Sequence, residues 1–373
     1  MVKFIIIGIG GLCLLLTWLP VHRHEAWWIR LGDFPRVQVA LIAMIVAAGY
    51  GYGYGVARWE DKLFIAFLLG SILWQCLSIL PYTPLVRRQV QRSRRASAAP
   101  TSFSLVAANI LMPNRDAATT LRTIARVCPD VIILCETDAW WAGQMTPLEK
   151  DYPYTIKHPL ENTYGMLLYS RLPLIDPCIE FLIEDDIPSF HTKIKLRSGD
   201  EIELRALHPR PPVPTENDGS LERDAELLLV GKVVKDSPRP VVVAGDLNDV
   251  AWSRTTTLFQ KISGLLDPRV GRGSYNTFHA QYPFLRVPLD HVFHSRHFRL
   301  IRMRRLAAGG SDHFPIYISL SYEPDAKVLQ EKATATVEEM TEAREVIAQA
   351  ITENSPDAPV EATIAERKEG IAL

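Results

Sequence analysis

Residues 241–249 read V-V-V-A-G-D-L-N-D, and the fold of the middle of the chain can be worked out from this stretch. Its β-branched run is typical of a buried strand that ends at Gly245. Asp246 and Asn248 follow at once, and residues two apart on an extended chain point the same way. A carboxylate and an amide can therefore be aimed together at one substrate group. The same letters also suit a strand followed by an Asx-type turn, so the stretch alone leaves both interpretations open.

Other short apolar runs on both sides of this stretch also end in polar residues. The expected strands are residues 103–108, 131–135, 165–169, 190–196, 201–207, 241–244, 291–293 and 316–320, and the expected helices are 117–127 and 221–234. This mixture predicts a layered α+β domain over residues 101–322. The polar residues beside the strands are Asn109, Glu136, His208, Asp246, Asn248, Asp290, Asp312 and His313. Each alone has an ordinary explanation, such as a turn, but together they predict convergence on one edge of the sheets.

Two of these residues offer the ligands of a hard divalent cation. Magnesium prefers oxygen ligands and takes one or two carboxylates while it keeps several waters. Glu136 and Asp312 could supply these carboxylates. A metal held there would polarise a phosphoryl oxygen and stabilise developing charge.

The remaining residues suit the other tasks of phosphoester hydrolysis. Asp246 is the candidate base that takes a proton from water. His313 paired with Asp290 is a candidate proton donor or phosphate contact, because a carboxylate favours the charged imidazole. Asn109 and Asn248 offer amide groups to a phosphate without adding negative charge.

These motifs, in this order, resemble the endonuclease/exonuclease/phosphatase superfamily over residues 101–322. They are A-N-I at Asn109, C-E-T at Glu136, Y-G-M-L-L-Y-S-R-L-P from Tyr164, L-H-P-R-P-P at His208, G-D-L-N at Asp246, P-L-D-H-V at Asp290 and G-S-D-H-F-P-I at Asp312. The G-D-L-N motif and the last one are the most specific. The resemblance implies a four-layered α/β sandwich, with two packed mixed sheets flanked by helices. It also implies cleavage of phosphoester bonds with Mg²⁺ or Mn²⁺.

The resemblance implies metal-binding roles for three residues. Glu136 corresponds to the main metal ligand, and Asn109 to its neighbour, which also contacts substrate. Asp312 corresponds to a further metal-associated carboxylate.

Catalytic and phosphate-binding roles are implied for five other residues. Asp246 corresponds to the group that orients or deprotonates the attacking water, and Asn248 and His208 to phosphate contacts. His313 corresponds to a phosphate-binding histidine oriented by Asp290. The sequence offers no clear match for an acid that partners His208.

Three apolar stretches precede the domain, at residues 4–19, 37–56 and 63–80. A membrane-spanning helix needs about 20 apolar residues. Residues 1–86 are therefore expected to form a membrane region with about three transmembrane helices. Buried helices of a soluble domain are an alternative, and the first stretch could be a signal-peptide core. The lack of a good small-x-small cleavage site after it favours an uncleaved span and a multi-pass protein of the cell membrane.

Basic residues around these apolar stretches suggest how the protein is oriented in the membrane. A basic linker is expected at residues 87–100, and its arginines are Arg87, Arg88, Arg92, Arg94 and Arg95. The connection after the first stretch contains Arg23, Arg30 and Arg36, whereas the next contains only Arg58 and Lys62. The positive-inside tendency then places the catalytic domain on the cytoplasmic side.

The substrate stays open between nucleic acid, lipid and a small phosphoester. Net charge is −1, and a strongly basic domain would have argued for nucleic acid. A local basic strip contains Arg296, Arg299, Arg302, Arg304 and Arg305, which could meet phosphates, anionic lipid or only solvent. The five cysteines include no C-x-x-C pair, which argues against a zinc site.

The last segment, residues 323–373, is acidic and poor in aromatics. We expect it to be largely mobile, with an amphipathic helix at about residues 337–351. An alternative function for the whole chain is a catalytically inactive, membrane-bound binding or scaffold protein. The intact set of acids, amides and histidines speaks against it.

Overall fold

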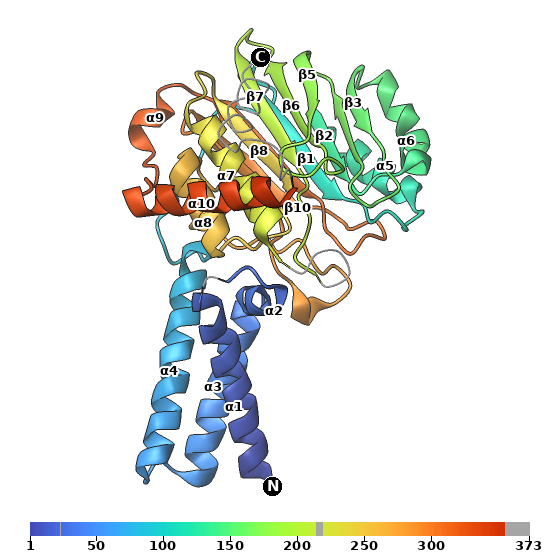
Figure 1. The fold of residues 1–373 in the computed structure, drawn as a ribbon. Helices are drawn as coiled ribbons and strands as arrows, with labels where there is room; N and C mark the ends of the chain where they lie inside the picture. The colour runs from blue at the N-terminus through green and yellow to red at the C-terminus, as the bar shows by residue number, and fades with distance from the viewer. Residues whose placement is uncertain (23, 214–218, 355–373) are drawn as a thin grey trace.

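The computed structural model describes residues 1–22, 24–213 and 219–354, so Arg23 and the end of the acidic tail lie outside the described residues. Figure 1 shows a slender bundle of helices standing below a layered domain of sheets and helices. The bundle is built from the first part of the chain and the domain from the rest.

Two mixed sheets form the middle of the domain, and each contains one parallel pair of strands. The first sheet has the order β10 (Phe298–Arg305), β11 (Ile316–Tyr322), β1 (Ser102–Asn109), β2 (Val131–Cys135), β4 (Met166–Ser170) and β3 (Tyr154–His158). The second has the order β5 (Leu174–Glu180), β6 (Ser189–Lys195), β7 (Glu201–Leu207), β8 (Val241–Asp246) and β9 (Asp290–His294). The parallel pairs are β1 with β2 and β7 with β8, and the other neighbours are antiparallel.

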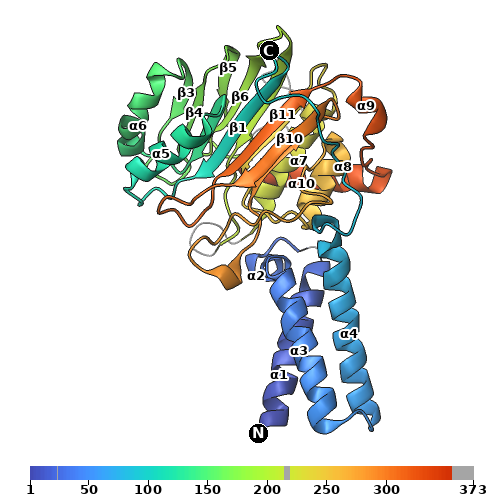
Figure 2. The same cartoon turned by 180° about the vertical axis from the view of Figure 1, so that it is seen from behind.

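Helices cover the outer faces of both sheets, which gives four layers (Figures 1 and 2). The first sheet carries α5 (Ala117–Val127) and α6 (Ala139–Met145), whose apolar side chains share a cluster with Val106 and Ile132. The second carries α7 (Leu221–Lys235), α8 (Arg254–Ser263) and α10 (Val337–Asn354). A third apolar cluster fills the space between the sheets. The predicted four-layered sandwich is therefore confirmed.

The buried strands have the pattern expected of a doubly covered sheet. All residues of β1, β2 and β8 are buried, because helices pack on one face and the other sheet on the opposite face. Five strands and α-helices of the domain were not predicted from the sequence: β3, β5, β10, α6 and α8. The strands β3 and β5 are edge strands, half exposed, and their sequences lack a strong apolar pattern.

Among the described residues, three helical segments are long and apolar enough to cross a membrane: Val2–His22, which begins with α1 (Val2–Trp18), Arg36–Tyr54, which is α3, and Trp59–Tyr82, which begins with α4 (Trp59–Ile79). This finding rests on length and composition. Short turns join α1 to α3, namely η1 (Leu19–His22), α2 (Trp27–Arg30) and η2 (Leu31–Asp33). The turn η3 (Leu80–Tyr82) follows α4. Both figures place α2 at the junction between the bundle and the domain.

The linker and the start of the tail are packed parts of the domain. Val90 is fully buried in the core between the sheets, and the backbone N–H of Ser93 donates to the carbonyl of Leu300 on β10. We expected the acidic tail to be largely mobile, but Ala343 and Ile347 of α10 are fully buried against α7. The predicted helix at residues 337–351 thus exists, and its apolar face holds it on the second sheet's outer layer.

Candidate active site

The parallel pair of the first sheet brings Asn109 and Glu136 together. In the register of β1 with β2, Asn109 stands opposite Cys135, so Glu136 is the next residue at the same edge. Strand β11 runs antiparallel to β1 and begins at this edge, with Ile316 opposite Ala107. The loop that carries Asp312 and His313 therefore enters the same place.

The second sheet repeats this arrangement. Leu207 pairs with Gly245 in the parallel pair β7 and β8, so His208 and Asp246 follow side by side. A side chain at Gly245 would clash with the backbone of Leu207, since a Cβ at this position would lie 2.0 Å from the Leu207 carbonyl oxygen. Glycine is therefore required here, and its φ of +146° is also one that other residues rarely adopt. Antiparallel β9 then places Asp290 directly opposite Asp246.

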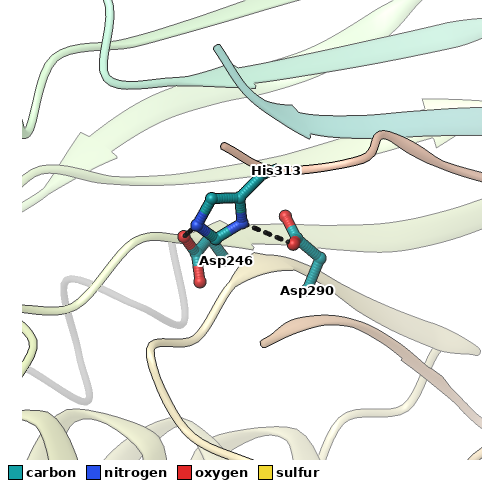
Figure 3. Close-up of side chains that lie close together, drawn as sticks. All are labelled: Asp246, Asp290 and His313. Atoms are coloured by element: carbon teal, nitrogen blue, oxygen red, sulfur yellow. Dashed lines mark hydrogen bonds and ion pairs between the residues drawn. The ribbon is translucent and has the colours of Figure 1, made fainter. Parts of the chain in front are cut away.

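His313 lies between the two carboxylates of the second sheet, as Figure 3 shows. Its Nδ1 is 2.8 Å from Oδ2 of Asp290, and its Nε2 is 3.6 Å from Oδ2 of Asp246. Burial alone would lower the pKa of His313, but the two carboxylates raise it to about 10. The imidazole is therefore positively charged at neutral pH, and its ring orientation is fixed by Asp290.

Asp246 is held by neighbours from three segments. Its Oδ2 accepts a hydrogen bond from Nδ2 of Asn109 at 3.0 Å, and its Oδ1 accepts one from the backbone N–H of Asn248 at 3.0 Å. Burial by itself would raise the pKa of Asp246, but His313, His208 and these hydrogen bonds lower it overall. Asp246 is thus ionised at neutral pH and can accept a proton or a hydrogen bond from water.

Glu136 directly follows β2, at the carboxyl end of the first sheet's parallel pair. Its Oε1 accepts from Nδ2 of Asn109 at 2.6 Å, and its Oε2 accepts from the backbone N–H of Met112 at 3.2 Å. Burial raises the pKa of Glu136 to about 7, although both hydrogen bonds oppose the rise. Its φ of +60° is unusual for a residue other than glycine, so the surrounding contacts must impose it.

His208 is buried and uncharged. Burial lowers its pKa to about 4, and its ring centroid lies 5.5 Å from that of Tyr164. As a phosphate contact it could therefore offer an N–H group but no charge. Tyr164 belongs to a motif noted in the sequence, yet the sequence assigned it no role at the site.

Asn248 and Asp312 complete the predicted set. The Asn248 amide donates to the carbonyl of Pro209 at 2.9 Å, and its backbone carbonyl accepts from Nη1 of Arg223 at 2.8 Å. Asp312 is partly exposed, and its Oδ1 lies 3.4 Å from the Ser311 hydroxyl. The structure therefore brings all eight sequence-predicted residues to one end of the two sheets.

A cavity of about 540 Å³ opens at this end. Six of the eight predicted residues line it, namely Asn109, Glu136, His208, Asn248, Asp312 and His313. The other two, Asp246 and Asp290, are buried directly behind His313. Among the described residues that line the cavity, none is lysine or arginine. The sequence did not predict that Trp27, Leu31 and Phe34, from the segment between the first two apolar helices, also form part of its wall.

Two groupings of these residues could hold a metal. The ligand atoms of Asp246, Asp290 and His313 lie within 4.8 Å of one another. However, a protonated His313 already offsets one of these two negative charges and is within hydrogen-bond distance of Asp290, so this group does not need a metal to be compensated. Glu136 has only neutral hydrogen-bond donors, and the carboxylates of Glu136 and Asp312, in a cavity whose described lining has no lysine or arginine, would repel a phosphate. A divalent cation on Glu136 and Asp312 would remove that repulsion, so these residues fit a metal.

Comparison with known proteins identifies the family and agrees with the fold. A family model described as Endonuclease/Exonuclease/phosphatase family matches residues 106–313, which is more than half of the chain and includes every predicted site residue. No curated protein sequence matches the chain.

Solved structures share the fold at low identity. D. rerio TDP2 humanized by 14 mutations is 17% identical, with 59% of this chain and 99% of that chain covered and a TM-score of 0.50. D. rerio TDP2 complexed with single strand DNA product is 18% identical, with the same coverage and TM-score. The human Nocturnin catalytic domain with bound sulfate anion is 16% identical, covers 60% of this chain and 95% of that chain, and has a TM-score of 0.48.

Proposed function

Because this chain belongs to the Endonuclease/Exonuclease/phosphatase family, we propose that it is a metal-dependent phosphoester hydrolase anchored in a membrane. The observation that carries the proposal is the position of His313 between Asp246 and Asp290, beside a cavity that Glu136 and Asp312 line. Such a set of charged groups at one end of two sheets is suited to binding and cleaving a phosphoester.

Glu136 and Asp312 are the proposed carboxylate ligands of the metal, and Asn109 belongs to the same proposed metal site, where its amide N–H holds the Glu136 carboxylate in place. Mg²⁺ or Mn²⁺ bound there would polarise a phosphoryl oxygen and stabilise developing negative charge. Asn109 donates to Glu136 and to Asp246 at once, so it fixes the distance between the metal ligand and the base.

Asp246 is the proposed base. The oxygen of a water molecule forms a bond to phosphorus, the bond to the leaving oxygen breaks, and Asp246 accepts the proton from that water. The leaving oxygen takes its proton from solvent. Charged His313, oriented by Asp290, stabilises the phosphoryl oxygens, and His208 and Asn248 donate hydrogen bonds to them.

Membrane anchoring is part of the proposal. The helices α1, α3 and α4 are the proposed spans, which would make the protein a multi-pass protein of the cell membrane with its catalytic domain on the cytoplasmic side. Their length and composition support the spans, and the basic residues after the third helix support the side.

The experiment measures hydrolysis by the full chain in detergent, in the presence of Mg²⁺. The substrates are a generic phosphodiester, plasmid DNA, RNA and a phospholipid. We expect Mg²⁺-dependent hydrolysis of at least one substrate, abolished by EDTA and reduced at least about 100-fold in Asp246→Asn. Asp236→Asn is the matched control, because Asp236 is exposed at the end of α7. A folded protein that neither binds Mg²⁺ nor cleaves any substrate would contradict the proposal and favour the binding or scaffold protein.

A further inference from the structure

We propose that the substrate is a lipid phosphoester, whose apolar chain binds against a wall that residues 27–34 contribute to the active site. The inference rests on the proposed function and deepens it, since it names the substrate class. It starts from the composition of the cavity, in which the candidate catalytic groups and an apolar surface lie side by side.

An apolar surface leads away from His313. The ring centroid of Phe278 lies 5.0 Å from that of His313, so one aromatic face directly adjoins the candidate phosphate-binding group. Phe278 and Phe34 pack against one apolar cluster, which includes Leu289. Leu31 and Trp27 continue the wall, and Leu31 is 49% exposed although its side chain is apolar. Such a surface beside a phosphate site suits a ligand with a polar head and an apolar chain.

The cavity lacks what a polyanion would need. Nucleic acid is bound along cationic side chains that follow its backbone, often with stacked aromatics. Among the described residues that line the cavity, none is lysine or arginine, and the basic strip that contains Arg299 does not line it. Arg299 is instead paired with Glu323 at 2.7 Å and with Asp325 at 3.1 Å. A single phosphate carried on an apolar chain fits this cavity better than an extended strand of phosphates.

The cavity also lies at the level where a membrane surface would be. The wall segment is the connection between α1 and α3, so it stands at one end of two candidate spans. The turn η5 (Pro283–Leu285) reaches the same level, because its Phe284 carbonyl accepts a hydrogen bond from Gln38 of α3 at 2.8 Å. Phe284 is 86% exposed. Both views show η5 close to α2, below the sheets. Exposed apolar side chains at this height are suited to a lipid interface.

Buried polar contacts fix the wall to the catalytic domain. Arg30 forms an ion pair with Asp224 at 3.1 Å, and Asp224 is paired with Arg223, whose Nη1 donates to the Asn248 carbonyl. The Trp252 indole donates to the carbonyl of Asp33 at 2.8 Å. The segment is thus held at the site by contacts on both sides of Leu31, so it forms a fixed part of the cavity wall.

The test compares two phosphodiesters that differ only in their chain, methyl p-nitrophenyl phosphate and hexadecyl p-nitrophenyl phosphate, on the full protein in phosphatidylcholine vesicles. We expect hexadecyl to exceed methyl in kcat/KM by at least 100-fold, and Leu31→Asp to reduce this selectivity at least tenfold. Val328→Asp is the control, because Val328 is 80% exposed on α9 (Ala326–Leu329) and does not line the cavity. The control also corrects for partition of the hexadecyl compound into vesicles, which affects both variants equally.

A ratio of hexadecyl to methyl kcat/KM near one, or an equal loss of this selectivity in Leu31→Asp and Val328→Asp, would overturn the inference. Cleavage of single-stranded DNA faster than of the hexadecyl diester would instead assign a nucleic acid substrate. Trp27→Ala serves as a second wall variant if Leu31→Asp does not fold. If the protein hydrolyses neither diester and none of the substrates of the first experiment, the proposed function fails. Photo-crosslinking with a diazirine-bearing hexadecyl phosphate then still tests whether the wall binds an apolar chain. The inference is supported if residues 27–34 are labelled and if excess hexadecyl phosphate, but not excess methyl phosphate, suppresses this labelling. Absence of such labelling would overturn the inference.

Discussion

Asp246 and Asp290 are direct cross-strand partners on β8 and β9, and each is only 1% exposed. Two buried carboxylates on neighbouring positions would repel each other strongly in a medium of low dielectric. His313 lies between them and neutralises part of this charge. Burial raises the pKa of Asp290, with a further contribution from Asp246, while His313 opposes the rise. The three groups therefore have to be treated as one unit, and a change in one should alter the others.

Replacing Asp290 by asparagine tests this unit. The variant removes a carboxylate that favours the charged imidazole, so the pKa of His313 should fall from about 10. Because the charge on His313 is present only below its pKa, the alkaline limb of the pH–rate profile should move to lower pH. We also expect kcat to fall by roughly 100-fold or more, as for loss of a positioned acid–base group. Asp236→Asn should change neither quantity, and an unmoved alkaline limb in Asp290→Asn would contradict the assignment.

Metal binding should depend on pH through Glu136. Its pKa of about 7 in the metal-free protein means that a proton occupies the carboxylate below that pH. Mg²⁺ must displace this proton, so the apparent affinity should fall about tenfold per pH unit below 7 and level off above it. Calorimetry in buffers of different ionisation enthalpy would measure the released proton. Glu136→Gln should bind more weakly and without this pH dependence, whereas exposed Glu331→Gln should behave as the unmodified protein.

Glu226 of α7 should make stability depend on pH. It is 3% exposed, and burial raises its pKa to about 8, from 4.5 as an ordinary carboxyl. Between these values the folded protein holds a proton that the unfolded chain has released, so the free energy of unfolding should fall as pH rises through this window. Glu226→Gln should remove the dependence and stabilise the protein at pH 9 by roughly 2 kcal/mol. Denaturation at pH 5 to 9 checks this, with exposed Glu345→Gln as the control.

The ion pair of Arg30 with Asp224 should be important for stability. Both side chains are less than 10% exposed, so removing Arg30 leaves part of the Asp224 charge buried without a partner. Arg30→Met should destabilise the protein by about 3 kcal/mol. The exposed pair of Arg239 with Glu201 offers the control, and Arg239→Met should change stability by less than about 1 kcal/mol. Equal effects of the two substitutions would show that the Arg30 pair is screened by solvent.

The sequence by itself determined the central strands and the residues that follow them. The β8 run is continuous and apolar because both faces of its sheet are covered, and such runs can be found without knowledge of their neighbours. Asp246 and Asn248 were visible because they follow that run directly. Helix α5 was predicted with its first and last residues, since Asp116 caps it and accepts from the Thr119 N–H at 3.0 Å.

Only the tertiary structure decided how these residues are charged and what surrounds them. The uncharged state of His208 and the high pKa of Glu136 come from burial, which a linear pattern does not show. The buried pairing of Arg30 with Asp224 joins residues 194 positions apart. Leu31 lies in a connection with no motif of its own, yet it lines the active-site cavity. The physical reason is that strand and helix patterns arise from contacts between near neighbours in the chain, whereas the cavity is formed by contacts between distant segments.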